Sequence, residues 1–408
     1  MTTARSATAE ERLATRRQLQ DLIRRIERRP HPPAPRATPE LPPLLSWRDT
    51  EAGRIGYREL RYGRNDLVGT QSLAPLFEVD ATSLHLLSRG NAEVGAPGTG
   101  ARDLLFFDIE TTGLGGAGAM VFMVALARID GTDLVLRQYV SPTPADEAVL
   151  LDAVIGDLGL PADPVLVTYN GLTFDAPFVD ERATLHRRRS GLQAARHLDL
   201  LHTVRRGYRG LLTSHRLATV EAELLKVKRP ELEVGGAEVP AWYFRFIRGG
   251  SMRFLDPLLD HNAVDVLALA ALVAQLHEGA IGTPDLRQAL ALRRLALASR
   301  SYVAAERHLR AAIEGLTSPE ARADAVRDLA IVCRTLGRRG DAVPELHWLA
   351  ESSAWHARWA SQQLAIYYEH HARDLKQALT EVDAVQIGPS GDAAWTRRRQ
   401  RLEGKLAC

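Results

Sequence analysis

Two carboxylates stand two residues apart at the end of an apolar run, in the segment FFDIETTGL. If this run is a strand, Asp108 and Glu110 project from the same face, because side chains along a strand alternate with a period of two. Acids beside Phe106, Phe107 and Ile109 are unfavourable unless a cation or protons compensate them. The pair therefore indicates a metal site, and ordinary surface acids at a strand end are the alternative.

Two further segments carry acids that could reach the same place. LVTYNGLTFDAPFV predicts a strand, a turn at Asn170 and Gly171, and a helix that begins near Asp175, where an acid is most often a plain N-cap. In LLDHNAVDVLAL, Asp265 lies one helical turn beyond His261, so both reach the same side of a helix. The histidine could deprotonate or orient an attacking water. The alternative is that these groups decorate the exposed side of an amphipathic helix.

Phosphodiester hydrolysis with two divalent ions is the chemistry that such acids could support. It needs several carboxylates aimed into one cleft, holding ions about 4 Å apart, so that one ion activates water and the other stabilises the leaving oxygen. Oxygen-rich ligation selects Mg²⁺ or Mn²⁺ over zinc. The cofactors expected here are therefore two Mg²⁺ or Mn²⁺ ions.

The elements around these segments predict a mixed α/β domain over residues 101–282. DLLFFDIE, GAMVFMVALARID and TDLVLRQYV read as three successive strands, which implies an antiparallel meander. A helix over about 145–158, the strand PVLVTYN and a helix over about 174–189 then add a helix-connected strand to the sheet. A long apolar helix closes the domain near Gly282.

The segments before this domain are less informative. Residues 1–44 predict a basic amphipathic helix, followed by a proline-rich linker that cannot continue it. This helix could lie across a phosphate backbone, although a solvated helix or a docking arm would have the same pattern. Residues 45–100 form an extension with short strand-like pieces, whose role the spacing does not reveal.

Residues 285–408 predict an all-α region, because strand signals vanish there and helical periodicity continues. A small-to-apolar step of four residues recurs in it at intervals of 36 to 37 residues: Ala305 and Leu309, Ala342 and Leu346, Ala378 and Val382. This interval approximates that of tetratricopeptide-like repeats, which stack helix pairs into a solenoid. An irregular helical bundle is the alternative.

Bulk properties set limits on the class of protein. The chain has 408 residues, enough for two domains, and its 52 basic and 50 acidic side chains nearly balance, so any nucleic-acid-binding surface must be local. RRRSGLQAARHLDLLHTVRRGYRG is one basic stretch able to hold phosphates. Two cysteines exclude a disulfide framework and a cysteine-ligated zinc site. Without an apolar run of membrane-spanning length or a secretory signal, we expect a cytoplasmic protein with no membrane partner.

In this order, the three acidic segments resemble the exonuclease motifs of the DEDD superfamily. More narrowly, FDIETTGL, TYNGLTFDAPFV, HLDLLHTVRR, LEVGGAEVPAWYFRFIRGG and HNAVDVLALAAL are similar to the YprB-type ribonuclease H-like family, predicted 3′-5′ exonucleases. The resemblance covers roughly residues 45–278. It implies a ribonuclease H-like fold, a mixed sheet flanked by helices, and it suits a helical region at the C-terminal end.

The resemblance also implies roles for individual residues. The metal ligands would be Asp108, Glu110, Asp175 and Asp265. The substrate contacts would be Thr111, Asn170 and Asn262. His261 takes the general-base position, with one departure: one DEDD branch has tyrosine four residues before the last Asp, and the other has histidine five before it. Here histidine stands four before it and Asp260 stands five before it.

The function expected from these features is 3′-5′ exonucleolytic hydrolysis of single-stranded DNA or RNA, with the helical region binding a protein partner or part of the substrate. A non-catalytic nucleic-acid-binding adaptor is one alternative, and retention of all four acids argues against it. An endonuclease on the same fold is another alternative, since the carboxylates alone do not determine the polarity of cleavage. The choice between DNA and RNA depends on loop geometry that the sequence does not define.

Overall fold

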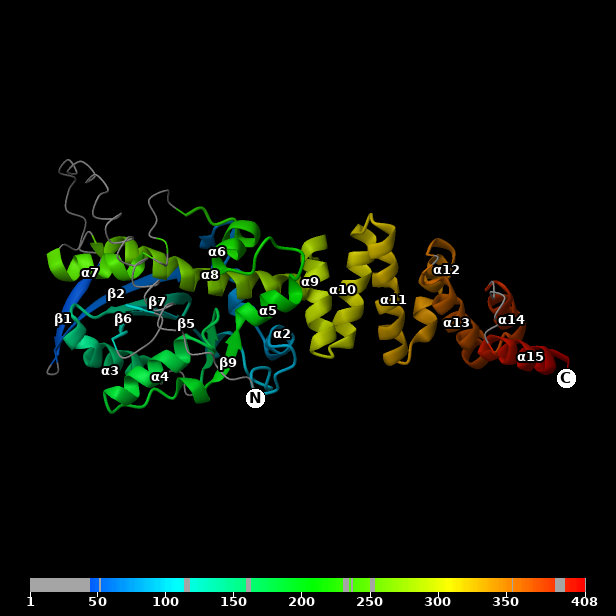
Figure 1. The fold of residues 1–408 in the computed structure, drawn as a ribbon, viewed down its shortest axis with the longest axis horizontal. Coiled ribbons are helices and arrows are strands. Elements are labelled where there is room, and N and C mark those ends of the chain that lie inside the picture. Colours follow the sequence, from blue (N-terminus) through cyan, green and yellow to red (C-terminus); the bar gives the residue numbers. More distant parts are fainter. Residues whose placement is uncertain are drawn as a thin grey trace, which may run out of the picture.

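The computed structural model describes residues 45–50, 53–113, 118–158, 163–229, 235, 238–249, 254–353, 355–385 and 393–407. The molecule is elongated, with a sheet and its covering helices at one end and a row of helices leading to the other (Figure 1). The predicted basic helix and proline-rich linker in residues 1–44 lie outside the described residues.

A seven-stranded mixed sheet organises the α/β part. In spatial order its strands are β1 (Ser46–Thr50), β2 (Gly53–Gly63), β7 (Asp133–Val140), β6 (Val121–Asp130), β5 (Leu104–Thr111), β8 (Val165–Thr168) and β9 (Arg196–Asp199). β5, β6 and β7 form the predicted antiparallel meander, and β8 and β9 continue the sheet parallel to β5. The predicted fold class, a mixed sheet with helices followed by an all-α region, is confirmed.

The segment 45–100, whose role the sequence did not reveal, divides into two parts. β2 pairs antiparallel with β7, and β1 pairs with β2, so the first part adds two strands to the edge of the sheet. The second part contains a short hairpin and two helical pieces: β3 (Leu67–Val68), β4 (Gln71–Ser72), η1 (Ala74–Glu78) and α2 (Ala81–Leu87). Leu73, Leu76 and Leu84 are fully buried, and this part packs against the long helix α8.

Helices cover both faces of the sheet (Figure 1). Leu105 and Phe107 of β5 pack on one face with α3 (Glu147–Leu158) and α4 (Asp175–Leu185). Leu104 and Phe106 point to the other face, towards α5 (Leu200–Gly207) and α8 (Asp256–Ile281). Between these last two helices come α6 (Leu217–Val220), the π-helical turn η5 (Glu221–Leu225) and α7 (Val239–Gly249). Strand β5 is therefore buried on both sides, which explains its continuous apolar run.

Helix α8 corrects the expectation that no apolar run approaches membrane-spanning length. By length and composition alone it could cross a bilayer, with a mean hydropathy of 1.5 in its most apolar window. However, 72% of that window is buried inside the protein. The helix packs between the sheet and the segment that includes η1. Both of its sides are apolar because both are buried against other parts of the protein.

The C-terminal region is helical, as predicted. Its α-helices are α9 (Leu286–Ala298), α10 (Tyr302–Gly315), α11 (Pro319–Thr335), α12 (Val343–Ser352), α13 (Ala357–Tyr367), α14 (Leu375–Asp383) and α15 (Ala393–Ala407). Each packs against the next one along the chain. The six residues of the recurring four-residue step are all buried: Ala305, Leu309, Ala342, Leu346, Ala378 and Val382. The assignment to tetratricopeptide-like repeats stays a prediction.

Candidate active site

Asp108 and Glu110 lie at the carboxyl end of β5 and face α8. They continue the alternation that directs Leu104 and Phe106 to this helix, so the predicted common face is the α8 face. The pairing of β5 with β6 is irregular between Glu110 and Thr111, where the register shifts. Such a bulge turns the end of a strand and re-aims its side chains. The two acids thus emerge where regular pairing ends.

Asn262 on α8 holds Asp108 in place. Its side chain is fully buried, and its Nδ2 donates to Oδ2 of Asp108 at 2.7 Å. Gln138 of β7 donates through Nε2 to Asn262 Oδ1 at 3.0 Å and to the Leu259 carbonyl at 2.8 Å. These bonds fix which way the amide points. In this structure Asn262 therefore supports the Asp108 carboxylate, and its predicted contact with substrate stays a prediction.

His261 and Asp265 stand on the same side of α8, as the four-residue spacing predicts. His261 Nε2 lies 3.7 Å from Asp265 Oδ2 and 3.9 Å from Oε1 of Glu110. All three side chains are mostly buried, with exposed fractions of 10% to 17%. The end of β5 and one face of α8 therefore meet through these groups.

Asp175 begins α4 and is 6% exposed. The loop before it follows β8, so it starts at the same sheet edge as the acids of β5, which runs parallel to β8. Asp199 orders this loop, because its carboxylate accepts hydrogen bonds from the backbone N–H groups of Asn170 at 2.9 Å and Leu172 at 3.2 Å. These bonds give Asp199 a structural role.

The turn in this loop depends on two backbone positions. Asn170 has a φ of +71°, a left-handed conformation that asparagine tolerates better than most residues. A Cβ on Gly171 would stand 2.6 Å from the Thr168 side chain, so the chain passes too close for any other residue. The exposed Asn170 side chain accepts a hydrogen bond from Thr173 Oγ1 at 3.0 Å.

Thr111 is 9% exposed and follows Glu110 at the bulge. Its Oγ1 donates to the Gly113 carbonyl at 2.9 Å, which shapes the chain as it leaves β5. Its predicted contact with substrate stays a prediction, as does that of Asn170.

The four acids share one buried region and repel one another. Burial raises the pKa of Asp108 well above its usual range, and the charges of Asp175, Asp265 and Glu110 raise it further. Burial also raises the pKa of Glu110 well above its usual range, with the charges of Asp265 and Asp175 adding to the effect. For Asp175, burial raises the pKa to about 7. A cation among these groups would relieve the repulsion.

Arg229 supplies positive charge to this region, and sequence reasoning missed it. Its guanidinium pairs with Asp265 and also with the buried Glu221, at 2.5 Å from Nε to Oε2. Its Nη1 lies 3.0 Å from Nδ1 of His261. No periodic signal marks this arginine in the sequence KVKRPELE, and only the turn after η5 brings it to α8.

Comparisons with known proteins identify the superfamily and a relative of this chain. A model of the RNase H superfamily matches residues 105–277. The uncharacterized protein YprB of Bacillus subtilis (strain 168) is 32% identical over 329 residues, which are 79% of this chain and 78% of that protein. The chain belongs to the YprB family of ribonuclease H-like proteins. The family B DNA polymerase of the hyperthermophilic archaeon Pyrobaculum calidifontis is also similar, with a TM-score of 0.34 and 18% identity, over 52% of this chain and 28% of the polymerase.

The superfamily match encloses the whole site of this YprB relative, from the strand of Asp108 to the helix of Asp265. The donor set fits a hard divalent cation in its chemistry, since it consists of buried carboxylates with too little positive charge around them. Among the described residues, no three acidic, histidine or cysteine side chains form a ready-made metal cluster. Asp265 instead pairs with Arg229. Binding an ion would require the carboxylates to draw together and Asp265 to exchange the guanidinium for the ion.

Proposed function

We propose that this YprB-family chain is a metal-dependent 3′-5′ exonuclease acting on single-stranded nucleic acid. The observation that supports it best is the meeting of acids from three distant segments in one buried region, with His261 beside them. These acids are Asp108, Glu110, Asp175 and Asp265. Without a bound cation such a group destabilises the folded protein, because each buried charge raises the electrostatic free energy of the acids beside it. Its presence favours a catalytic role over the adaptor alternative.

The four acids would divide between two ions. Asp108, Glu110 and Asp265 would hold one Mg²⁺ or Mn²⁺, Asp108 would also reach the second, and Asp175 would order its bound water. When bound, the two ions would supply an activated water and stabilise the leaving oxygen. Asn262 would keep the Asp108 carboxylate fixed during this exchange, through its 2.7 Å hydrogen bond.

His261 would orient the attacking water. Arginine can only donate hydrogen bonds, so the contact between Arg229 Nη1 and Nδ1 makes Nδ1 the acceptor. A neutral ring then carries its hydrogen on Nε2, the atom that faces Glu110 and Asp265. In this state Nε2 can orient an oxygen by donating to it but cannot take a proton from it. Service as a general base would require Arg229 to leave Nδ1.

The test uses single strands of DNA and of RNA labelled at the 3′ or the 5′ end, with Mg²⁺ or Mn²⁺. We expect stepwise loss of nucleotides from the 3′ end, abolished by EDTA and reduced by orders of magnitude in Asp108→Asn. Asp130→Asn, which changes an exposed acid at the end of β6, is the matched control and should retain activity.

A strand blocked at its 3′ end separates the alternatives. Cleavage inside this blocked strand would show that the protein is an endonuclease on the same fold and not an exonuclease. Binding of the strand without cleavage under any metal condition would instead support the non-catalytic adaptor.

A further inference from the structure

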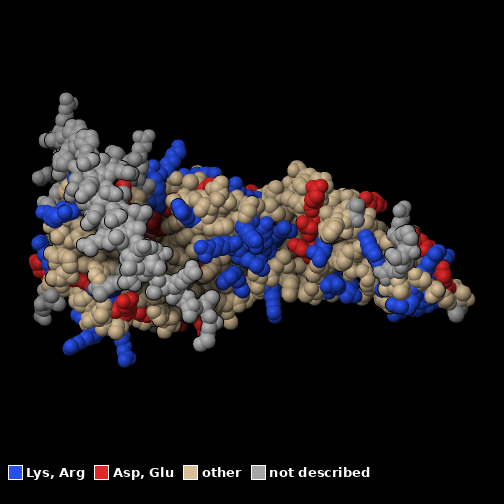
Figure 2. Space-filling model, in the orientation of Figure 1, with Lys and Arg blue, Asp and Glu red and all other residues tan. Residues whose placement is uncertain are grey.

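Arginines gather where the α/β part meets the helical region. Arg205, Arg206 and Arg209, at the end of α5 and just after it, line a pocket of about 320 Å³ together with Arg294 and Leu297 of α9. Figure 2 shows a broad blue patch over this junction. We call this feature the arginine pocket. It lies apart from the acids of β5 and α8.

Among the residues that the structure describes, the guanidiniums at its rim have no acidic partner. No ion pair joins Arg205, Arg206 or Arg209 to a carboxylate within the described part of the chain, and all three are exposed. Two other arginines of the same basic stretch do have an acidic partner. Arg188 pairs with Asp152, and Arg196 pairs with Asp163 at 3.1 Å. Within the described part of the chain, Arg187 and Arg189 of this stretch are also exposed and without an ion pair, but they follow α4. Only Arg205, Arg206 and Arg209 of the stretch gather at the pocket.

Arg294 forms the floor of the pocket. Its Nη1 donates to the carbonyls of Gly207 at 2.9 Å and Arg209 at 2.7 Å, which fixes the chain as it leaves α5. Burial lowers the pKa of Arg294, and the charges of Arg293, Arg209 and Arg206 lower it further. Like charges held together in this way are unfavourable unless an anion joins them.

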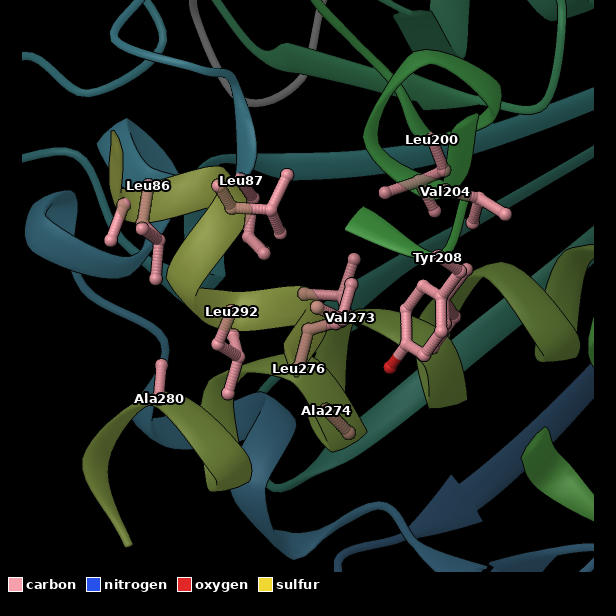
Figure 3. Close-up of a cluster of buried hydrophobic side chains, with 14 of the residues drawn as sticks. Leu86, Leu87, Leu200, Val204, Tyr208, Val273, Ala274, Leu276, Ala280 and Leu292 are labelled. Carbon is pink, nitrogen blue, oxygen red and sulfur yellow. The ribbon is translucent and has the colours of Figure 1, made fainter. Parts of the chain in front are cut away.

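The pocket stands on a rigid base. Tyr208, between the rim arginines, is fully buried, and Figure 3 shows it among Val204, Val273 and Leu276. Helix α5 packs on α9, and a Cβ on Gly207 would be in ordinary van der Waals contact with the Ala291 side chain at 3.4 Å. The arginines are therefore presented from packed helices, which limits the entropy lost when a ligand binds.

Helix α5 connects the arginine pocket to the catalytic edge of the sheet. Its N-cap is Asp199, the residue that orders the loop before Asp175. Its eight residues span about 12 Å at the helical rise per residue. Arg205 is near enough to Tyr169, which precedes that loop, for its charge to lower a tyrosine pKa that burial raises. A strand leaving the acids along α5 would reach the pocket within a few nucleotides.

We propose that the arginine pocket binds a backbone phosphate of the single strand, a few nucleotides from the bond that is cleaved. This proposal rests on the proposed function, because it takes the strand to run from the acids to the pocket. Guanidinium groups match phosphate oxygens by charge and by their paired donors. A phosphate contact positions the strand without reading its sequence, so the effect should be the same for strands of any sequence.

The experiment measures binding of oligonucleotides of increasing length and at several salt concentrations, in an Asp108→Asn background that cannot degrade them. The test variant is Arg206→Gln with Arg209→Gln. The matched control is Arg187→Gln with Arg189→Gln, which removes the same charge from exposed positions after α4, on the opposite face of the sheet. Because all four side chains are exposed, each variant should keep the melting temperature of the parent.

We expect the pocket variant to bind long strands about tenfold more weakly. Its slope of log affinity against log salt should be less steep by about 0.7 for each phosphate that the arginines no longer neutralise. The gain in affinity from a trinucleotide to a long strand should shrink, whereas the control should match the parent. Equal affinities and equal slopes for the pocket and control variants would overturn the proposal.

A further experiment measures the binding of inorganic phosphate and of a nucleoside monophosphate. If the pocket variant loses binding of these small anions while its affinity for long strands is unchanged, the pocket takes a free anion and the proposal is wrong. The proposed function is tested separately, by the hydrolysis assay. A wild-type protein that hydrolyses no strand would refute the exonuclease, while the binding comparison would still test the pocket.

Discussion

Replacing Asp175 with asparagine should stabilise the metal-free protein at high pH, although it removes a predicted metal ligand. Burial raises the pKa of Asp175 to about 7, from 3.8 for the ordinary group. Because the folded state has the higher pKa, it binds the proton more tightly than the unfolded chain does. The free energy of unfolding therefore falls as the pH rises from about 4 to about 7. At about 1.4 kcal/mol per pKa unit, the full penalty above pH 7 is about 4 kcal/mol.

Asparagine avoids this penalty but loses one acceptor. Backbone groups of Asp175 and Ile109 hydrogen-bond to the carboxylate and lower its pKa, so they stabilise the charged form. Losing one such bond costs about 1 kcal/mol. We therefore expect Asp175→Asn to be more stable than the wild type by about 3 kcal/mol at about pH 8, and slightly less stable near pH 4. Saturating Mg²⁺ should stabilise the wild type more than the variant, since only the wild type keeps the carboxylate that would order the water bound to the ion.

The assay is hydrogen exchange of peptides from β5 in EDTA, read by mass spectrometry between about pH 5 and about pH 8. It reports on the sheet itself, which suits a chain whose two parts need not unfold in one step. Asp130→Asn is the control for a change of charge away from the site. A stability difference between wild type and Asp175→Asn that is the same at every pH would refute the reasoning.

Three other changes test the contacts around the acids. Asn262→Ala should lower the free energy of unfolding by about 1–3 kcal/mol, because it leaves buried polar groups without partners; an unchanged melting temperature would contradict this. Arg229→Gln should tighten Mg²⁺ binding, since it removes the cation paired with Asp265; calorimetry showing equal or weaker binding would count against that account. Gly171→Ala should reduce strand hydrolysis, because its Cβ would lie 2.6 Å from a threonine side chain, whereas Gly156→Ala, with open space around it, should not. Equal rates for these two glycine variants would show that the loop tolerates displacement.

The acids could be predicted because periodicity fixes direction. The alternation along β5 sends Asp108 and Glu110 to one face, and the helical spacing sends His261 and Asp265 to one side of α8. Each rule acts within one element, so a sequence is enough to apply it. That the two faces meet is a tertiary fact, and it entered the prediction only through the family resemblance.

The supporting residues could not be predicted, because their roles depend on packing between distant elements. Asn262 stands in a polar run that reads as the exposed side of a helix, yet it is fully buried against Asp108. Arg229 reaches Asp265 only after the turn that follows η5. In the N-terminal extension, β2 is half-buried along most of its length, which blurs the alternation that identifies a strand. Its partner β7 lies far along the chain, so no local signal shows the pairing.

The acids beside α8 and the arginine pocket carry opposite charges, and one bound strand with its metal ions would compensate both. The whole chain is nearly neutral, with a formal charge of +2. Within its described part, however, acids are concentrated beside α8, and arginines without an acidic partner are concentrated beside α9. Each group is unfavourable by itself, because like charges are held together in a packed setting. Divalent ions would compensate the acids and a phosphate would compensate the arginines. A single strand bound together with the ions would supply both. We therefore expect Mg²⁺ and strand together to raise the melting temperature of Asp108→Asn less than that of a wild-type protein held with a non-hydrolysable strand, because the variant lacks the acid that both ions would share.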